Sequence, residues 1–360
     1  MNCRIFLVFI SVFFILPAQA VPVNGLYSAD IDLPVTRPES QMLTQAFGLA
    51  AERVLIKVSG NQKAITGDVL RQAKKLAPNW VAQHSVTALS ELLPQGDGFV
   101  TGKRTSVTFY QESIDRFLSQ NNLPVWGNNR PSVLVWLASE TNGVRRLSGS
   151  NAPSVLLNDF AVTASDVGIP IYAPLLDEVD QRNLAASDVW GLFEDNIRQA
   201  SQRYQTDSIA AIKVNEYPGY VSGNLLVMLK NGESERVTLT GETTKAILDQ
   251  ASLSLASVFS SRYASVRSDT STKSLTVQVA GIPTFQVLNK IQSYLESISV
   301  VRDVAVAVVE GQRVEFVVSI DGDKQKLFNS ISLSRLLLSA PLNALDPDAN
   351  RIVSYQYSGV

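Results

Sequence analysis

The strongest constraint on the fold is a regular alternation of apolar residues near the C-terminus. Every second residue is Leu, Val, Phe or Ile in three runs, at 275–279, 304–308 and 314–320. This period of two is typical of strands that bury one face. Helical spacing of apolar residues follows the first and third runs, over 284–298 and 324–338, and a last strand is predicted at 352–357. Residues 273–360 are therefore predicted to follow the order β-α-β-β-α-β, which is the ferredoxin-like arrangement.

The N-terminal part has the pattern of a second domain, over residues 21–123. A helix is predicted at 39–58, and Gly60 is expected to end it, as glycine commonly does just past a helix. Strands at 81–92 and 99–110 are predicted to form a hairpin around the turn-rich residues 94–98.

The central part, residues 131–265, is predicted to form an α/β domain. Its strongest local signal is Asn231-Gly232, a pair typical of tight hairpin turns. A helix is predicted over 188–204 with Ser187 as its N-cap, and a longer one over 243–263. The whole chain is thus predicted to be an α+β protein made of several small α/β modules.

Two linkers are predicted between these blocks. Residues 123–131 contain prolines, asparagines and a glycine, and residues 265–273 are polar and rich in serine. Exposed linkers with little backbone pairing are preferred sites of proteolysis. We therefore expect proteases to cut first at these two places.

The first twenty residues have the pattern of a secretory signal peptide. Arg4 supplies a positive charge, residues 5–16 form an apolar run, and Ala18 and Ala20 have the spacing that signal peptidase requires. The apolar run is too short for a membrane-spanning helix, which needs about 20 residues. We expect cleavage between Ala20 and Val21, export to the periplasm, and no stable membrane span afterwards.

Composition excludes several classes of protein. The hydrophobic content of 45% and charged content of 18% are those of a well-packed globular chain. Cys3 is the only cysteine, so cleavage of the signal peptide would leave a cysteine-free protein without disulfides. The formal net charge of −2, without a basic cluster, argues against nucleic-acid binding, which depends on neutralising phosphates.

The residues that carry most enzyme chemistry are scarce in this chain. His84 is the only histidine, and it has no recognisable nucleophile motif beside it. Zinc sites usually need several His or Cys ligands, so no metal and no cofactor are expected. The densest acidic cluster, Asp177-Glu178 with Asp180, is interpreted as a solvated loop. The sequence therefore predicts a non-catalytic protein, although chemistry that uses carboxylates alone stays open.

Several segments together resemble a known but uncharacterised family. They are the predicted signal peptide, the helix end 51–60 (AERVLIKVSG), the strand 130–136 (RPSVLVW) and the region 277–320. They are similar to a gammaproteobacterial group catalogued as domain of unknown function 2066. This resemblance implies a bacterial envelope protein, and no catalytic residues are established for that group. The central block also looks like small α/β modules found beside envelope assembly machines.

The alternation in the C-terminal block predicts a surface for a partner. The face opposite the two helices should carry small and mostly uncharged residues, which is unusual for a sheet face left in water. The residues assigned to partner docking are Thr276, Gln278, Ala305, Ala307, Glu315 and Val317, together with Tyr355 on the last strand, which is expected at a sheet edge. The alternative is that this face packs against the central block of the same chain.

These observations predict an accessory or assembly factor of the periplasm that binds other envelope proteins. Two alternatives remain at this point. One is an envelope hydrolase that acts with carboxylates alone, and the other is a carrier that holds a small ligand between the central and C-terminal blocks.

Overall fold

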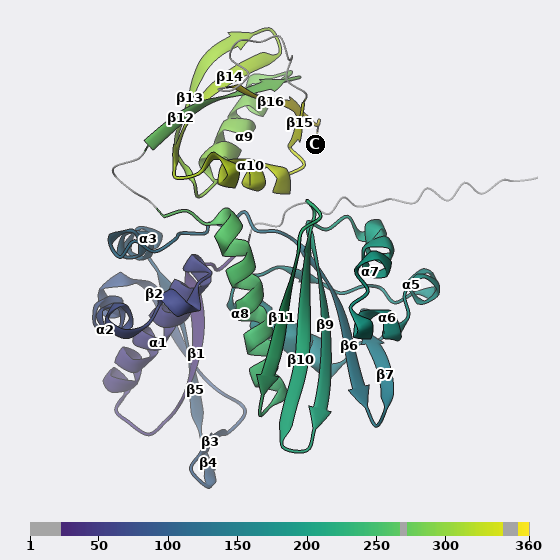
Figure 1. Cartoon of the computed structure of the whole chain (residues 1–360). Helices are drawn as coiled ribbons and strands as arrows, with labels where there is room; N and C mark the ends of the chain where they lie inside the picture. Colours follow the sequence, from purple (N-terminus) through teal and green to yellow (C-terminus); the bar gives the residue numbers. More distant parts are fainter. Residues whose placement is uncertain (1–22, 267–271, 341–351, 360) are drawn as a thin grey trace, which may run out of the picture.

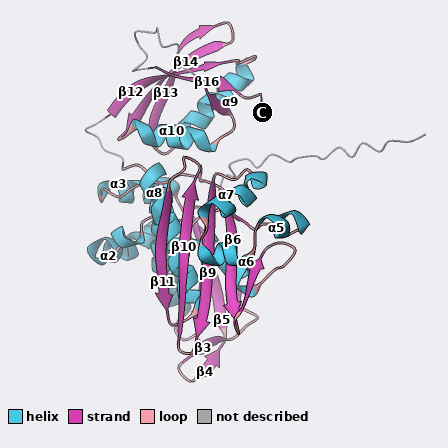
Figure 2. Cartoon of the chain, turned by 45° about the vertical axis from the view of Figure 1, so that its right-hand side comes forward, coloured by secondary structure: helices cyan, strands magenta, loops and turns pink. Residues whose placement is uncertain are grey.

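The structure is a computed structural model that describes residues 23–266, 272–340 and 352–359. Over these parts the strands form sheets of three, six and five strands and one small hairpin, and helices cover the larger sheets (Figures 1 and 2). The predicted α+β class is confirmed.

The N-terminal module is an antiparallel sheet in the order β1-β5-β2 with α1 against it. Its elements are β1 (Ser28–Pro34), α1 (Glu39–Ser59), α2 (Gly67–Leu76), β2 (Val81–Ala88), β3 (Leu93–Gln95), β4 (Gly98–Val100), β5 (Gly102–Phe109) and α3 (Gln111–Gln120). Small residues such as Ala46, Ala50 and Ala51 are fully buried on α1, which lets the helix lie close to its neighbours. Gly60 ends α1 in the left-handed conformation, with φ of 64°, as predicted.

The central module is a mixed sheet in the order β11-β10-β9-β6-β7, with the short β8 beside β6. Its elements are β6 (Val133–Thr141), β7 (Val144–Ser148), α4 (Val155–Asp166), β8 (Ile171–Tyr172), α5 (Glu178–Asn183), α6 (Ala186–Gly191), α7 (Glu194–Ser201), β9 (Ser208–Tyr217), β10 (Tyr220–Leu229), β11 (Ser234–Gly241) and α8 (Thr244–Tyr263). β6 buries Val133, Val135 and Leu137 under α4 and α8, and its alternate residues Leu134 and Trp136 under α6 and α7. The sequence of a strand that is buried on both faces is a continuous apolar run, and the sequence of β6 begins with such a run.

The predicted helix 188–204 is wrong as a single element. The chain forms α6, α7 and a short 3-10 turn, and Leu192 between the two helices has a positive φ of 53°. Gly191 precedes it, and glycine weakens a helix interior. The N-cap is also not Ser187: α6 begins after Ala185, whose backbone N–H donates to the Asp188 carboxylate at 2.8 Å.

The C-terminal module has the predicted order of elements with one strand added. Its elements are β12 (Thr272–Ala280), α9 (Phe285–Glu296), β13 (Val301–Glu310), β14 (Arg313–Asp321), α10 (Lys324–Leu333), β15 (Leu337–Ser339) and β16 (Ile352–Tyr357). The strand order is β13-β14-β12-β16-β15, and β12 and β16 run parallel. The predicted helix 324–338 ends early, at Leu333, because the following residues turn to form β15 beside β16.

The predicted linker 123–131 is a buried joint and not an exposed connection. Val125 pairs with Ser265, and the Trp126 backbone N–H donates to the Val58 carbonyl at 2.8 Å. The indole of Trp126 and the side chain of Arg130 are 1% and 0% exposed. Distant parts of the chain supply these partners, which a local sequence pattern cannot reveal.

The C-terminal module rests on the central module through its helix side. α10 contacts α8, and Asn329 Nδ2 donates to the Arg262 carbonyl at 3.3 Å. Asn129, in the joint, donates to the Ser330 carbonyl at 3.0 Å. In Figures 1 and 2, α10 lies between the C-terminal sheet and the rest of the molecule, so the opposite face of that sheet is turned away.

Candidate functional site: the free edge and outer face of the C-terminal sheet

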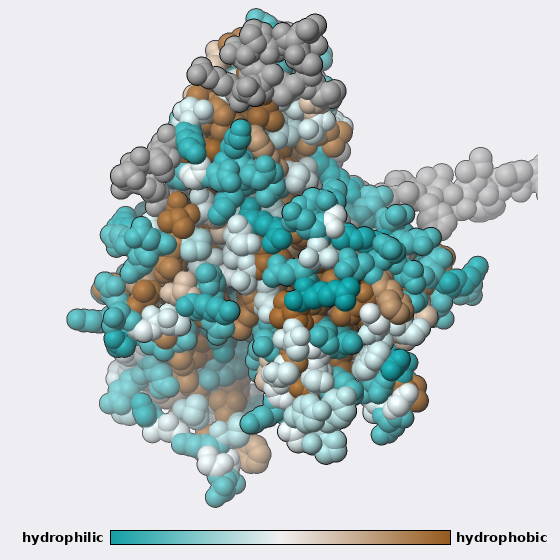
Figure 3. All heavy atoms as spheres, viewed as in Figure 1, coloured by the Kyte–Doolittle hydropathy of each residue, from teal (hydrophilic) through white to brown (hydrophobic). Residues whose placement is uncertain are grey.

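The strand β13 exposes apolar side chains along its second half. Residues 305–309 are all exposed, and Val306, Val308 and Val309 are 39%, 39% and 58% exposed. β14 pairs with one side of β13, and no strand in the described part of the chain pairs with the other. Figure 3 shows hydrophobic side chains at the surface of this module. An unpaired strand edge offers N–H and C=O groups to another strand, and an apolar one is a hazard unless it is covered.

A β-bulge explains why the predicted burial of β13 is wrong beyond Val304. The pairing register shifts between Val306 and Val308, so Val308 stands opposite Glu315 and Val309 opposite Val314. The extra residue moves Val308 to the outer face. Val306 stays opposite Phe316 but is exposed, whereas Val304 is 6% exposed. The adjacent pair Val308-Val309 breaks the alternation and is the signal that could have revealed the bulge.

The outer face of the sheet carries the predicted docking residues in two rows. One row crosses the strands through Ala305, Val317, Thr276 and Ile352. The neighbouring row is polar, since Gln278 Nε2 donates to Glu315 Oε1 at 3.0 Å and Ser354 Oγ donates to Gln278 Oε1 at 3.3 Å. Ala307 lies in the bulge and is exposed. The face is therefore a row of mostly apolar side chains, with Thr276 as its one polar member, beside a hydrogen-bonded polar row.

Tyr355 does not belong to this surface. It stands opposite Val279, on the side covered by the helices, and is only 6% exposed. The expected sheet edge at the last strand is also wrong, because β15 pairs with β16 from Tyr355 to Tyr357. The edge with an exposed apolar run is at the other end of the sheet, on β13.

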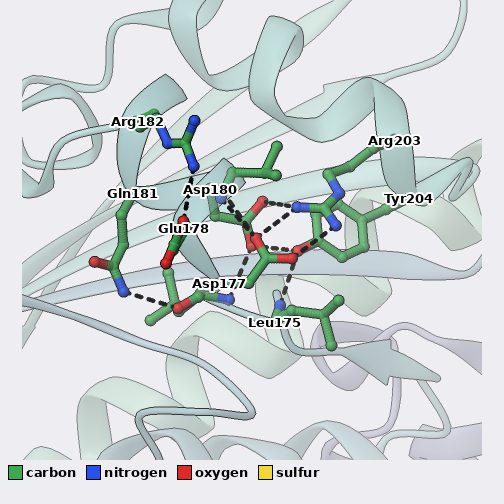
Figure 4. Close-up of polar contacts among 10 residues, drawn as sticks. Leu175, Asp177, Glu178, Asp180, Gln181, Arg182, Arg203 and Tyr204 are labelled. Atoms are coloured by element: carbon green, nitrogen blue, oxygen red, sulfur yellow. Dashed lines mark hydrogen bonds and ion pairs between the residues drawn. The ribbon is translucent and has the colours of Figure 1, made fainter.

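The acidic cluster at Asp177 and Asp180 is built into the fold and is not a solvated loop. Asp177 caps α5 by accepting from the backbone N–H groups of Val179 and Asp180 at 3.1 and 3.0 Å (Figure 4). Arg203 donates to both oxygens of Asp177, at 2.7 and 2.8 Å, and to Asp180 at 3.0 Å. The hydrogen bond from Arg203 lowers the pKa of Asp177 to about 2.

Asp180 is 1% exposed, and each of its oxygens has a partner. Besides Arg203, it accepts from the backbone N–H of Leu176 at 2.8 Å and from the hydroxyl of Tyr204. Burial, and then the hydrogen bond to Asp180, raise the pKa of Tyr204. The carboxylates hold the turn before α5, where Leu176 has a positive φ of 53°. Both carboxylates are thus engaged in contacts within the fold.

A groove lies between the central and C-terminal modules, where a carrier was expected to hold its ligand. Its volume is about 390 Å³, and its wall combines Lys230 and Arg335 with Phe328, Leu337 and Val353. Arg335 already donates to Gln205 Oε1 at 2.8 Å. The groove is therefore a mixed polar and apolar surface and not a purely apolar pocket.

The remaining predictions concern His84, metal binding, membrane spanning and the signal cleavage site. His84 lies on β2, exposed, with its ring 5.3 Å from that of Phe47. Within the described ranges no three His, Cys, Asp or Glu side chains are grouped so that they could hold a metal ion. No helix in those ranges has the length and apolar character needed to cross a membrane. Ala20 and Val21 lie outside the described residues.

Comparison with known protein families gives a match in the N-terminal part of the chain. Residues 20–127 match the model of a domain of unknown function (DUF8605). No curated protein matches the chain. The match covers the N-terminal module and the start of the buried joint, so it supports an uncharacterised domain there and assigns no activity. It does not support the resemblance to domain of unknown function 2066 or to a gammaproteobacterial envelope family.

Proposed function

We propose that this chain is a non-catalytic accessory or assembly factor that binds other proteins of a bacterial cell envelope. The observation that carries the proposal is the exposed apolar edge of β13, where Val306, Val308 and Val309 lie on the side with which no strand of the described residues pairs. Natural sheet proteins protect such edges with charges, prolines or covering segments. Residues 305–309 contain no charge and no proline.

The partner docks on this edge as an extended segment that adds a strand to the sheet. Main-chain hydrogen bonds then supply affinity, and side chains of alternate residues supply specificity. Full burial of one valine side chain is worth about 1.5–3 kcal/mol. The outer row at Ala305 and Val317 continues the apolar surface from the edge across the sheet.

The compartment follows from the predicted signal peptide and from the resemblance to a gammaproteobacterial envelope family. Export through a cleavable signal places the partners among periplasmic or membrane-associated proteins. Nucleic acid is not the proposed partner, because the chain has a formal net charge of −2 and its sequence has no basic cluster to neutralise phosphates.

The hydrolase alternative has weaker support. Its best acidic cluster, Asp177 with Asp180, is engaged by Arg203 and by backbone N–H groups. A carrier would use the groove of about 390 Å³ beside Lys230 and Phe328, and that groove is the observation in its favour.

Photo-crosslinking in intact bacteria tests the proposal. A photoreactive amino acid at position 308 of the full chain should crosslink to one or a few defined envelope proteins, identified by mass spectrometry. The same amino acid at Val162, which is 62% exposed on α4, is the matched control. Equal capture at both positions would contradict the proposal.

Charge substitutions provide the second arm of the test. Ala305→Glu combined with Ala307→Lys should abolish the crosslinks from position 308 and leave the melting temperature unchanged, because both side chains are exposed. Val162→Glu should change neither. Persistent capture by the double variant at an unchanged melting temperature would show that the partner docks elsewhere.

A further inference from the structure

One face of the central sheet is covered by helices over only part of its length. α6 and α7 pack over Trp136, Ala211 and Leu226 on this face. In Figure 1 the lower ends of β9, β10 and β11 face the viewer, and no helix of the described chain lies in front of them. The residues there are half-buried or exposed and share one side of the three strands. We call this surface the open face, and its members are Lys213, Asn215, Tyr217, Tyr220, Ser222, Asn224, Thr238 and Thr240.

Two tyrosines form an exposed aromatic platform at one end of the open face. Tyr217 and Tyr220 stand opposite each other on either side of the two-residue turn between β9 and β10. Their rings stack, with centroids 4.7 Å apart and planes 13° from parallel, and yet the two residues are 42% and 51% exposed. Asn215 Nδ2 donates to the Tyr217 hydroxyl and so holds that ring in place. The platform is ordered in advance, so a ligand that packs on it loses little side-chain entropy.

Amides and hydroxyls fill the two rows beside the tyrosines. The first row crosses the strands through Thr240, Ser222 and Asn215, and the second through Thr238, Asn224 and Lys213. Side-chain amides and hydroxyls both donate and accept hydrogen bonds. Sugar hydroxyls have the same double capacity, and the C–H faces of sugar rings pack on aromatic rings. The rows and the platform together therefore suit a chain of sugar rings.

The charge of Lys213 indicates which kind of sugar chain fits. Its Nζ lies 5.8 Å from the centroid of the Trp190 ring, and it forms no ion pair with any acid of the described residues. The two arginines at the borders of the face are already paired, Arg145 with Glu140 at 2.8 Å and Arg236 with Glu194 at 3.0 Å. A single free cation complements a ligand with isolated carboxylates, whereas a densely charged phosphate chain requires several cations.

We propose that the open face binds a linear polysaccharide that carries a carboxylate on some of its rings. One ring packs on the stacked Tyr217 and Tyr220, and a carboxylate pairs with Lys213. Ring hydroxyls exchange hydrogen bonds with Asn215 and Asn224. Adjacent strands are about 4.8 Å apart, so a chain that crosses β9, β10 and β11 meets side chains over roughly 10 Å. This site lies on a different module from β13 and is independent of protein binding there.

Calorimetric titration of the full, exported chain with a hyaluronan hexasaccharide, in which every second ring carries a carboxylate, tests the proposal. Saturable binding is expected, and it should weaken as the salt concentration rises, because an exposed ion pair is screened. The neutral hexasaccharide of N-acetylglucosamine should bind at least tenfold more weakly. Inorganic tripolyphosphate should not displace the hyaluronan hexasaccharide.

Two variants separate the charge from the platform. Lys213→Gln should weaken binding of the hyaluronan hexasaccharide about tenfold, while its melting temperature and its affinity for the neutral hexasaccharide stay unchanged. Tyr217→Ala combined with Tyr220→Ala should weaken binding of both sugars about tenfold, because the platform packs against rings of either kind. Lys230→Gln, at an exposed lysine just after β10, and Tyr110→Ala, at a tyrosine that is 58% exposed, are the matched controls and should bind like the unaltered chain.

The proposal is overturned if the hyaluronan hexasaccharide does not bind saturably, if the neutral sugar binds as tightly, or if tripolyphosphate displaces the hexasaccharide. It is also overturned if Lys213→Gln leaves the affinity for hyaluronan unchanged or lowers the affinity for both sugars equally. The tyrosine variant overturns it by binding both sugars like the unaltered chain. If that variant melts at a lower temperature, Asn224→Ala takes its place, and an unchanged affinity of Asn224→Ala for both sugars then overturns the proposal.

Discussion

The guanidinium of Arg130 lies 3.9 Å from the centroid of the Trp126 indole ring, and both side chains are buried where the N-terminal and central modules meet. Arg130 donates to the carbonyl of Lys57 at 2.7 Å and to those of Val167 and Gly168 at 3.1 and 3.2 Å. Burial lowers the pKa of Arg130 from its ordinary value. Backbone carbonyls and an aromatic face compensate the buried cation, so one side chain joins two modules.

Replacement of Arg130 should therefore destabilise the protein strongly. Arg130→Met leaves buried carbonyls without donors, and the expected loss is about 3–5 kcal/mol in the free energy of unfolding by urea. Arg130→Lys should lose most of this too, because lysine lacks the planar fork that reaches several acceptors at once. Arg182→Met, at a side chain 73% exposed on α5, is the control and should change stability by no more than about 0.5 kcal/mol. A loss below about 1 kcal/mol for Arg130→Met would contradict the assigned role.

Gly60 and Gly67 offer a matched pair at positive φ. Alanine at either position adopts a strained conformation, with a cost of about 1–2 kcal/mol. At Gly60 the new Cβ would lie 2.5 Å from Ser260 Cβ, whereas nothing lies within 4 Å of that position at Gly67. Gly60→Ala should therefore cost about 1–3 kcal/mol more than Gly67→Ala in urea unfolding. Ser260→Gly should recover part of the excess, and equal costs for the two alanine variants would refute the close contact.

Limited proteolysis distinguishes a buried joint from an exposed linker. Chymotrypsin should cut after Phe99, which is 70% exposed on the β3–β4 hairpin, before it cuts after Trp126, which is 1% exposed. Mass spectrometry of the first fragments identifies the order. Arg130→Met should make cleavage after Trp126 faster, because that variant loosens the joint. Early cleavage after Trp126 in the unaltered chain would mean that residues 123–131 are exposed after all.

The ion pair of Asp177 should appear in the pH dependence of stability. Its pKa is about 2 in the folded protein against an ordinary value of 3.8, so the folded state binds the proton less tightly than the unfolded state. The stabilisation is then complete above about pH 4 and is lost as the pH falls towards 2. Asp177→Asn keeps a capping side chain but removes the charge. Its melting temperature should be lower than that of the unaltered chain at pH 7, and the two should converge near pH 2.

Glu178→Gln provides the comparison for this experiment. Glu178 is adjacent in sequence, and its side chain is 87% exposed in a pair with Arg182. Surface pairs of this kind contribute little. A difference between Asp177→Asn and the unaltered chain that stays constant from pH 7 to pH 2 would show that the charge of Asp177 is not the cause.

Ionisation of the Tyr355 phenol should destabilise the protein in alkaline solution. Burial raises its pKa from 10.0 to about 12, so the unfolded chain loses the phenolic proton first and stability falls as the pH rises above 10. Tyr355→Phe should differ little at pH 7 and should lose less stability than the unaltered chain between pH 10 and 12, measured by urea unfolding. Tyr110→Phe removes the same hydroxyl from a side chain that is 58% exposed and is the control. Identical pH profiles for Tyr355→Phe and the unaltered chain would contradict the burial of this phenol.

The sequence by itself determined the parts of this protein that depend on local preference. The end of α1 at Gly60 follows from a conformation that glycine adopts without strain, and the turn at Asn231-Gly232 from the same property. The order of elements in the C-terminal module follows from its alternating periods. The alternation also predicted that Ala305 and Ala307 lie on the face opposite the helices, and both residues are exposed.

Only the tertiary structure decided which of these surfaces are covered. The local pattern of residues 123–131 predicts a linker. Their partners, Lys57 and Gly168 among them, lie far away in the sequence, so the local pattern cannot show that the segment is buried. Arg203, 26 residues from Asp177, forms an ion pair with the carboxylate that caps α5. The bulge at Ala307 moved Val308 to the outer face, and β15 covered the edge expected at Tyr355. Periodicity determines which side chains share a face, but burial depends on which distant segment packs against that face.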